Sequence, residues 1–233
     1  MATYSDNFQR ANENPLKSPW VYFGGNFQLS GHLIEPQFGA SNGYGGAYMY
    51  YGPVVGDQFA QVTVKTINAS SYAGPAVRMT TFKGGAAWYQ FQFGGPLGSE
   101  GYVYLEKYLS TGGSYLQYAL ATVNSGDVLK LTAVGNVLTC YLNGTQVLQA
   151  MDSDLTSGWF GASAYAGNVA SDAQISAWSG GSIDSSSWNN LTFVSVPTTP
   201  TSAGTPGQAA YDSVYLYVCT AVNTWERALL SSL

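Results

Sequence analysis

Charged residues are scarce in this chain. Asp, Glu, Lys and Arg make up 9% of its 233 residues, against roughly 25% in an average soluble domain. Only 8 residues are Lys or Arg, they are scattered, and the formal net charge is −5. We therefore expect no nucleic-acid partner, because nothing would neutralise a phosphate backbone. Few charges also argue against long helices with solvated faces.

Residues that commonly hold metals or act as catalytic bases are also few. His32 is the single histidine, and it stands in a Ser-Gly-His turn where a surface or structural role is expected. Cys140 and Cys219 each lie in an apolar run, so we read them as buried residues, with a disulfide between them as the alternative. We predict no cofactor and no metal; a calcium ion would find its best ligands in Asp6 and Asp172.

Long hydrophobic runs are missing as well. No apolar segment approaches the roughly 18 residues of a membrane-spanning helix, and the N-terminus lacks the basic start and apolar core of a secretory signal. We expect a soluble protein without membrane insertion. If it acts outside a cell, another route takes it there.

Glycine, tyrosine and alternating apolar residues are abundant, with 28 Gly and 18 Tyr in the chain. Residues 126–151 predict three antiparallel strands joined by turns at Gly135-Asn136 and Asn143-Gly144. Apolar and polar residues alternate along many further segments, which predicts an all-β sandwich. These predicted strands cover residues 59–67, 75–82, 86–93, 102–109, 157–165 and 173–178.

The composition changes after the sandwich. Residues 179–187 are rich in Gly and Ser and predict a linker, and residues 188–196 predict one strand. After a segment dense in Pro and Thr, residues 211–220 and 224–230 predict a hairpin. We therefore place the sandwich at 1–181 and a small C-terminal β module with its linker at 182–233. The C-terminal module has so little apolar material that its stability alone would be marginal. We therefore expect it to self-associate or to dock on the sandwich.

Residues 1–181 resemble the concanavalin A-like, laminin-G-like jelly-roll modules of bacterial and phage proteins. The family includes sugar binders, glycan-cleaving enzymes and modules without a known ligand, so the resemblance implies a fold more than a function. The residues that carry it are Asp6-Asn7-Phe8, Arg10-Ala11-Asn12, Pro19-Trp20, Gly25-Asn26-Phe27-Gln28-Leu29, Gly74-Pro75-Ala76-Val77-Arg78, Gly126-Asp127-Val128-Leu129-Lys130-Leu131, Leu142-Asn143-Gly144 and Asp152-Ser153-Asp154-Leu155-Thr156-Ser157-Gly158.

Residues 196–233 resemble the C-terminal segment of phage tail-fibre and other virion-surface proteins, with a departure at Glu226, where a basic residue is usual. The resemblance implies a virion protein that assembles in the host cytoplasm, acts outside the cell and forms homo-oligomers, trimers above all. The residues that carry it are Pro200, Ala203-Gly204-Thr205-Pro206-Gly207-Gln208, Ala210-Tyr211-Asp212, Tyr215-Leu216-Tyr217-Val218-Cys219, Asn223-Thr224-Trp225 and Arg227.

The predicted strands 75–82, 86–93 and 102–109 share a polar face that suits a sugar. Aromatic rings would stack on the apolar side of a pyranose, and planar polar groups would bond its hydroxyls. The candidate carbohydrate-binding residues are Arg78, Trp88, Gln90, Gln92, Tyr104, Glu106 and Tyr108. The alternative is an ordinary solvent face stabilised by cross-strand pairs. A second candidate is residues 43–51, with Tyr44, Tyr48, Tyr50 and Tyr51, which equally suit a plain strand.

Catalysis is not expected from the sequence. Jelly-roll glucanases place alternate acids on one strand as Glu-x-Asp-x-Glu, and no such run occurs here. We therefore predict a non-catalytic phage virion surface protein, of the tail-fibre, adhesin or decoration type, that binds host or environmental glycans. The alternatives are a structural virion ornament without a ligand and, less favoured, a polysaccharide depolymerase of lyase type using Arg78 with Gln90, Gln92, Tyr104 and Tyr108.

Overall fold

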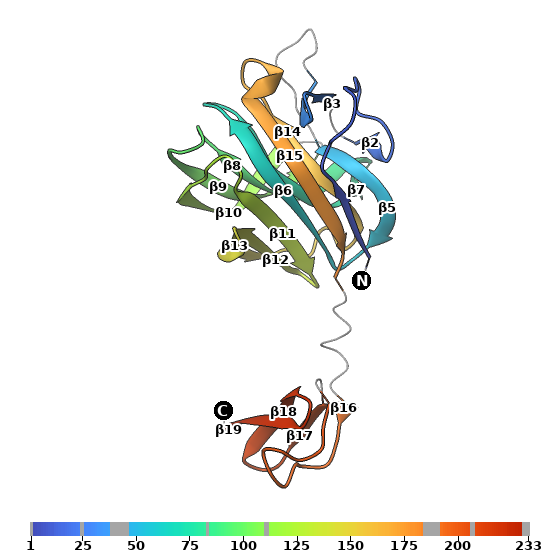
Figure 1. Cartoon of the computed structure of the whole chain (residues 1–233), viewed down its shortest axis with the longest axis vertical. Coiled ribbons are helices and arrows are strands. Elements are labelled where there is room, and N and C mark those ends of the chain that lie inside the picture. Colours follow the sequence, from blue (N-terminus) through green and yellow to red (C-terminus); the bar gives the residue numbers. More distant parts are fainter. Residues whose placement is uncertain are drawn as a thin grey trace. The chain divides into compact units, whose positions relative to one another are not determined.

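The chain folds into two compact units, Met1–Ile183 and Asp184–Leu233 (Figure 1). A computed structural model describes residues 2–23, 26–37, 47–82, 84–109, 112–183, 192–205 and 208–229. Our prediction placed the boundary between residues 181 and 182, at the Gly/Ser-rich segment.

The first unit consists of two antiparallel sheets packed face to face (Figure 1). The eight-stranded sheet runs β13 (Thr145–Met151), β12 (Val137–Leu142), β11 (Val128–Val134), β6 (Gln58–Ile67), β15 (Ala173–Ser182), β4 (Leu33–Pro36) and β3 (Phe27–Ser30), with β1 (Thr3–Asp6) also paired to β15. The seven-stranded sheet runs β10 (Gly112–Thr122), β9 (Glu100–Leu109), β8 (Gly85–Gly94), β7 (Tyr72–Phe82), β14 (Gly158–Tyr165), β5 (Ala47–Val55) and β2 (Trp20–Tyr22). The predicted all-β sandwich is confirmed.

The core lies between the two sheets and follows from the alternation of side chains along each strand. Val62 and Val64 of β6 enter it from one sheet, Phe91 and Phe93 of β8 enter it from the other, and all four are buried. The free thiol of Cys140 is buried in the same core. Among the described residues the helical content is a single 3-10 turn, η1 (Ala170–Asp172), and no helix there is long and apolar enough to cross a membrane.

The predicted three-stranded meander is confirmed as β11, β12 and β13. Both predicted turns are present: Gly135 has φ +55°, and Asn143 and Gly144 have φ of +49° and +81°. Two-residue hairpin turns require such left-handed conformations because they match the twist of the flanking strands.

The second unit holds one four-stranded sheet: β16 (Thr192–Phe193), β17 (Gln208–Tyr211), β18 (Tyr215–Ala221) and β19 (Thr224–Leu229). The predicted hairpin of 211–220 and 224–230 is confirmed as β18 and β19. The strand predicted at 188–196 is present only at β16, and residues 188–191 lie outside the described residues. Trp225 is the one large buried side chain of the described part of this unit, and its indole Nε1 donates to Ser202 O at 3.1 Å.

Candidate functional site

The pairing of β8 with β9 brings six of the seven candidate residues onto one face of the seven-stranded sheet. Trp88 pairs with Tyr108, Gln90 with Glu106 and Gln92 with Tyr104. The intervening residues, including Tyr89, Phe91 and Leu105, are buried in the core between the sheets. The six therefore lie on the opposite side, which we call the outer face.

Arg78 does not belong to this outer face, and its prediction there is wrong. A β-bulge shifts the pairing of β7 with β8 between Val77 and Thr80, and Arg78 adopts φ +51° within it. The bulge turns the guanidinium toward the core side, where it is 1% exposed. It donates to three backbone carbonyls, those of Gly56 at 3.1 Å, Leu155 at 2.9 Å and Gly135 at 2.5 Å.

The same bulge moves Met79, which the alternation predicted to point inward like Val77. Met79 is instead packed with Ala76 and Trp88 in a small apolar cluster separate from the main core. Phe23 and Trp159 pack against this cluster from other parts of the chain. Trp88 is consequently only 2% exposed. Its ring therefore packs beneath the surface residues and is not accessible for stacking on a ligand.

A chain of hydrogen bonds orients the polar centre of the outer face. Trp88 Nε1 donates to Gln90 Oε1 at 2.7 Å, and Gln90 Nε2 donates to Glu106 Oε2 at 2.6 Å. Gln92 Nε2 donates to Ser163 Oγ at 2.9 Å. Burial raises the pKa of Glu106 above its usual value, although the hydrogen bond from Gln90 opposes this. The centre is therefore a set of fixed amides around one carboxylate.

Gly113 of β10 makes room for that carboxylate. A Cβ atom at position 113 would lie 1.6 Å from Glu106 Oε1, so any side chain there would have to displace the acid. Gly113 pairs with Tyr108, and two residues further along β10 Tyr115 pairs with Glu106. The absence of a side chain at 113 thus permits the observed position of Glu106.

Aromatic rings flank the polar centre at both ends. At one end Tyr108 stacks on Trp88, with ring centroids 4.1 Å apart and planes at 19°. At the other end Tyr104 stacks on Tyr115, with centroids 5.0 Å apart and planes at 29°. Tyr115 is 59% exposed, so this second end presents an open aromatic surface.

Sequence reasoning missed several residues of this face. The alternation identified no strand at β10, because a register shift between Tyr115 and Gln117 breaks the period of two. That bulge puts Tyr115 and Tyr118 on one face at a spacing of three residues. Gly112 and Gly113 before the tyrosine-rich run were the available signal. The missed residues are Tyr72, Tyr102, Tyr115, Tyr118 and Ser163. Tyr72, Tyr102 and Tyr115 contact the Tyr104 ring, Tyr118 contacts Tyr102, and Ser163 accepts the hydrogen bond from Gln92.

The second candidate segment, residues 43–51, is described only in part. Tyr44 lies outside the described residues. The backbone of Tyr48 pairs with Ala162, and that of Tyr50 pairs with Trp20 and Phe160. The described backbone is thus that of strand β5, in the interior of the seven-stranded sheet.

The two carboxylates considered for calcium are already engaged. Asp6 accepts hydrogen bonds from Arg10 Nη1 at 2.8 Å and Trp20 Nε1 at 2.8 Å. Asp172 accepts hydrogen bonds from Asn68 Nδ2 at 2.7 Å and from the amide of Val169 at 3.0 Å. No group of three or more His, Cys, Asp or Glu residues suited to a metal occurs in the described ranges.

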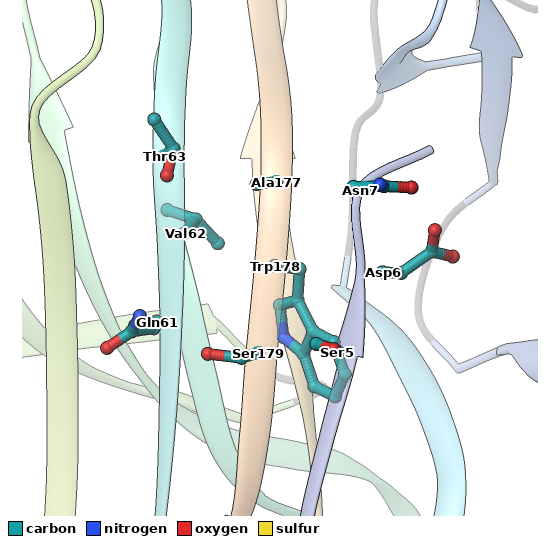
Figure 2. Close-up of a pocket in the computed structure, with 9 residues that line it drawn as sticks. All are labelled: Ser5, Asp6, Asn7, Gln61, Val62, Thr63, Ala177, Trp178 and Ser179. Atoms are coloured by element: carbon teal, nitrogen blue, oxygen red, sulfur yellow. The ribbon is translucent and has the colours of Figure 1, made fainter. Parts of the chain in front are cut away.

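A hollow of about 500 Å³ lies on the outer side of the eight-stranded sheet. Figure 2 shows it beside β15, with the carboxylate of Asp6 directed away from that strand. Its one aromatic residue, Trp178, is 2% exposed and donates to Gly161 O. The rest of its lining is mainly small and polar: Ser5, Asp6, Asn7, Gln61, Val62, Thr63, Ala177 and Ser179. Without an open ring, this hollow suits a sugar less well than the outer face of the seven-stranded sheet.

Comparison with solved structures identifies the fold. No family model matches the chain. A Bacillus subtilis protein of unknown function with a galectin-like fold aligns at TM-score 0.54 and 12% identity, covering 76% of this chain and 94% of that one. The carbohydrate-binding module CBM66 from Bacillus subtilis aligns at TM-score 0.50 and 17% identity, covering 68% and 91%. The first unit therefore has the galectin-like, concanavalin A-like jelly-roll fold of carbohydrate-binding modules and glycoside hydrolases.

Two further comparisons contradict our expectation that the protein is not an enzyme. A β-1,3-1,4-glucanase (lichenase) from a mouse hindgut metagenome shares the fold at TM-score 0.53 and 12% identity, covering 78% of this chain and 100% of that one. A capsule K30/K69-specific depolymerase of Klebsiella phage K64-1 is 56% identical over 39 residues. That match covers 17% of this chain and 5% of the depolymerase. The missing acid run therefore does not support a non-catalytic assignment.

Proposed function

We propose that this protein binds polysaccharide through the outer face of its seven-stranded sheet. The observation that carries the proposal is the arrangement on that face, where oriented amides and a carboxylate lie between two aromatic ends. The likeness of the fold to a carbohydrate-binding module supports it.

The chemistry of this face matches that of a sugar. A pyranose ring has an apolar side that packs on aromatic rings, and its hydroxyls need fixed donors and acceptors. Tyr104 and Tyr115 present the rings, while Gln92 and Glu106 are held by hydrogen bonds with Ser163 and Gln90. Side chains held in advance lose little conformational entropy on binding.

We further propose that the protein works on the surface of a phage virion, as a tail-fibre, adhesin or decoration protein. The segment shared with a phage capsule depolymerase supports this setting. In this proposal the chain assembles in the host cytoplasm as a homo-oligomer, with a trimer favoured, and meets bacterial surface glycans outside the cell. Several copies on one particle would convert weak single contacts into strong attachment.

The test is binding of the purified protein to an array of bacterial surface and plant polysaccharides. Replacement of both Tyr104 and Tyr115 by Ala should weaken binding at least about tenfold, because two stacking surfaces are lost. Tyr141→Ala is the matched control, since Tyr141 lies on β12 of the other sheet near Lys130. A folded protein that binds no polysaccharide would overturn the proposal and favour a purely structural virion component.

Polysaccharide cleavage is a second candidate function, favoured by the depolymerase segment and the shared glucanase fold. Glu106 would be the acid of such a reaction, since burial raises the pKa of its carboxyl above the usual value and a general acid needs such a shift. Glu100 is not its partner: six residues along β9 separate the two acids by about 20 Å, against about 5–9.5 Å in glycosidases. Arg78, needed for the lyase alternative, is on the other side of the sheet.

The cleavage test uses the polysaccharides that bind in the array. Size-exclusion chromatography after incubation would show shortened chains, and ultraviolet absorbance would separate an eliminated product from a hydrolysed one. Glu106→Gln should abolish cleavage while the protein stays folded. Cleavage that persists in this variant would exclude Glu106 as the acid.

A further inference from the structure

The outer face of the seven-stranded sheet carries acidic side chains, and no basic side chain on the described strands of this sheet points to it. Along β9, Glu100 and Glu106 alternate with core-facing residues and so lie on that face. Two basic residues stand on the strands of this sheet, but both point the other way. Arg78 is buried against Gly56, Leu155 and Gly135, and Lys107 pairs with Asp152 at 2.7 Å.

The remaining basic residues that the structure describes lie off the strands of this sheet. Lys83 lies outside the described residues. The other five are on loops or on strands of other sheets: Arg10, Lys17, Lys65, Lys130 and Arg227. Arg10 is held by Asp6 and Glu13, and Arg227 lies over the Tyr215 ring in the second unit. In the described part of the chain, no cation on the strands of this sheet points to the outer face to compensate an anionic ligand.

The carboxylate of Glu106 is fixed and has one oxygen open. Its Oε2 accepts the hydrogen bond from Gln90 Nε2, and Gln90 is held in turn by Trp88. Its Oε1 lies above Gly113 and accepts no hydrogen bond from the described residues. An open, oriented carboxylate oxygen accepts a hydrogen bond from a sugar hydroxyl, and its charge repels a sugar carboxylate.

We propose that this face selects uncharged polysaccharides, and that Glu106 is the residue that excludes anionic ones. The inference rests on the proposed function, because it names the ligand class of the same face. Gln90 and Gly113 position the acid, and the aromatic ends hold the rings of the bound chain. Like charges brought together without a counter-ion lower affinity, so an acidic sugar at this centre is disfavoured.

The experiment compares one backbone with and without charge. A neutral glucan that binds in the array is tested against the same glucan oxidised at C6 to carboxylates, by isothermal titration calorimetry. The wild-type protein should bind the neutral chain at least about tenfold more tightly. Glu106→Gln should reduce this ratio, mainly by improved binding of the oxidised chain, and it should stay folded because glutamine still accepts the bond from Gln90.

Glu226→Gln is the matched control, since Glu226 is exposed on β19 of the second unit. It changes the net charge equally and should leave the ratio unchanged. Equal or tighter binding of the oxidised chain by the wild type would overturn the inference, as would an unchanged ratio in Glu106→Gln. A folded protein that binds neither neutral nor acidic polysaccharides would instead overturn the proposed function, and the inference with it.

Discussion

The guanidinium of Arg78 donates a 2.5 Å hydrogen bond to the carbonyl of Gly135, which joins a strand of one sheet to a hairpin turn of the other. Further bonds to Gly56 and Leu155 bring three connections together around one buried side chain. Asp57 lies 3.8 Å from the same guanidinium and accepts a bond from the Gly135 amide. Arg78 is therefore a structural tie between the sheets.

Removal of this tie should destabilise the sandwich. Arg78→Ala leaves three carbonyls without their donor, so the free energy of unfolding should fall by about 3 kcal/mol, measured by urea denaturation. Arg78→Lys should recover part of the loss. Lys65→Ala, at an exposed position of β6, should change stability by less than about 0.5 kcal/mol. Equal stability of Arg78→Ala and Lys65→Ala would contradict the role given to Arg78.

A side chain at Gly113 should impair the outer face without a change to any polar group. The Cβ of Gly113→Ala would overlap Glu106 Oε1, so the carboxylate must move and the polysaccharide affinity should fall about tenfold. Ser114→Ala, at the next position of β10, is the control and should bind normally. If Gly113→Ala also bound normally, the position of Glu106 would not matter for recognition.

The buried acid should make stability depend on pH. The folded state raises the pKa of Glu106 above its unfolded value, so the folded protein holds this proton more tightly. Stability from this group is present at acid pH and is lost as pH rises from the usual glutamate pKa through the raised one. Glu106→Gln should therefore melt slightly higher than wild type at pH 7, with the gain vanishing near pH 4. Calorimetric scans across that range measure it, and a loss of stability at pH 7 would contradict the sign.

The stability of the second unit should depend strongly on Trp225, the one large side chain that is buried among its described residues. Ala209, Ala210 and Cys219 are the other buried apolar residues among its described positions, so Trp225→Ala should lower the free energy of unfolding of this sheet by about 3 kcal/mol or more. The sandwich should keep its melting transition, because Met1–Ile183 forms its own compact unit. Limited proteolysis should then release the second unit from an intact sandwich. Gly204→Ala, whose Cβ would lie 2.8 Å from the Trp225 ring, should act in the same direction.

Much of this architecture was determined by local sequence. Alternation along 86–93 and 102–109 decided which side chains enter the core, because successive residues of a strand point to opposite faces. Gly135-Asn136 and Asn143-Gly144 determined two hairpins, because they accept left-handed conformations. From these patterns alone, Gln90, Gln92, Tyr104, Glu106 and Tyr108 could be placed together.

Tertiary structure decided the rest, at the points where the alternation is interrupted. A bulge in β7 sent Arg78 into the core and Met79 to the outer face, and another in β10 placed Tyr115 and Tyr118 beside Tyr104. Trp88 became buried because Phe23 and Trp159 cover it from distant parts of the chain. A single extra residue reverses the direction of every later side chain, and only the pairing of complete strands shows where it is accommodated.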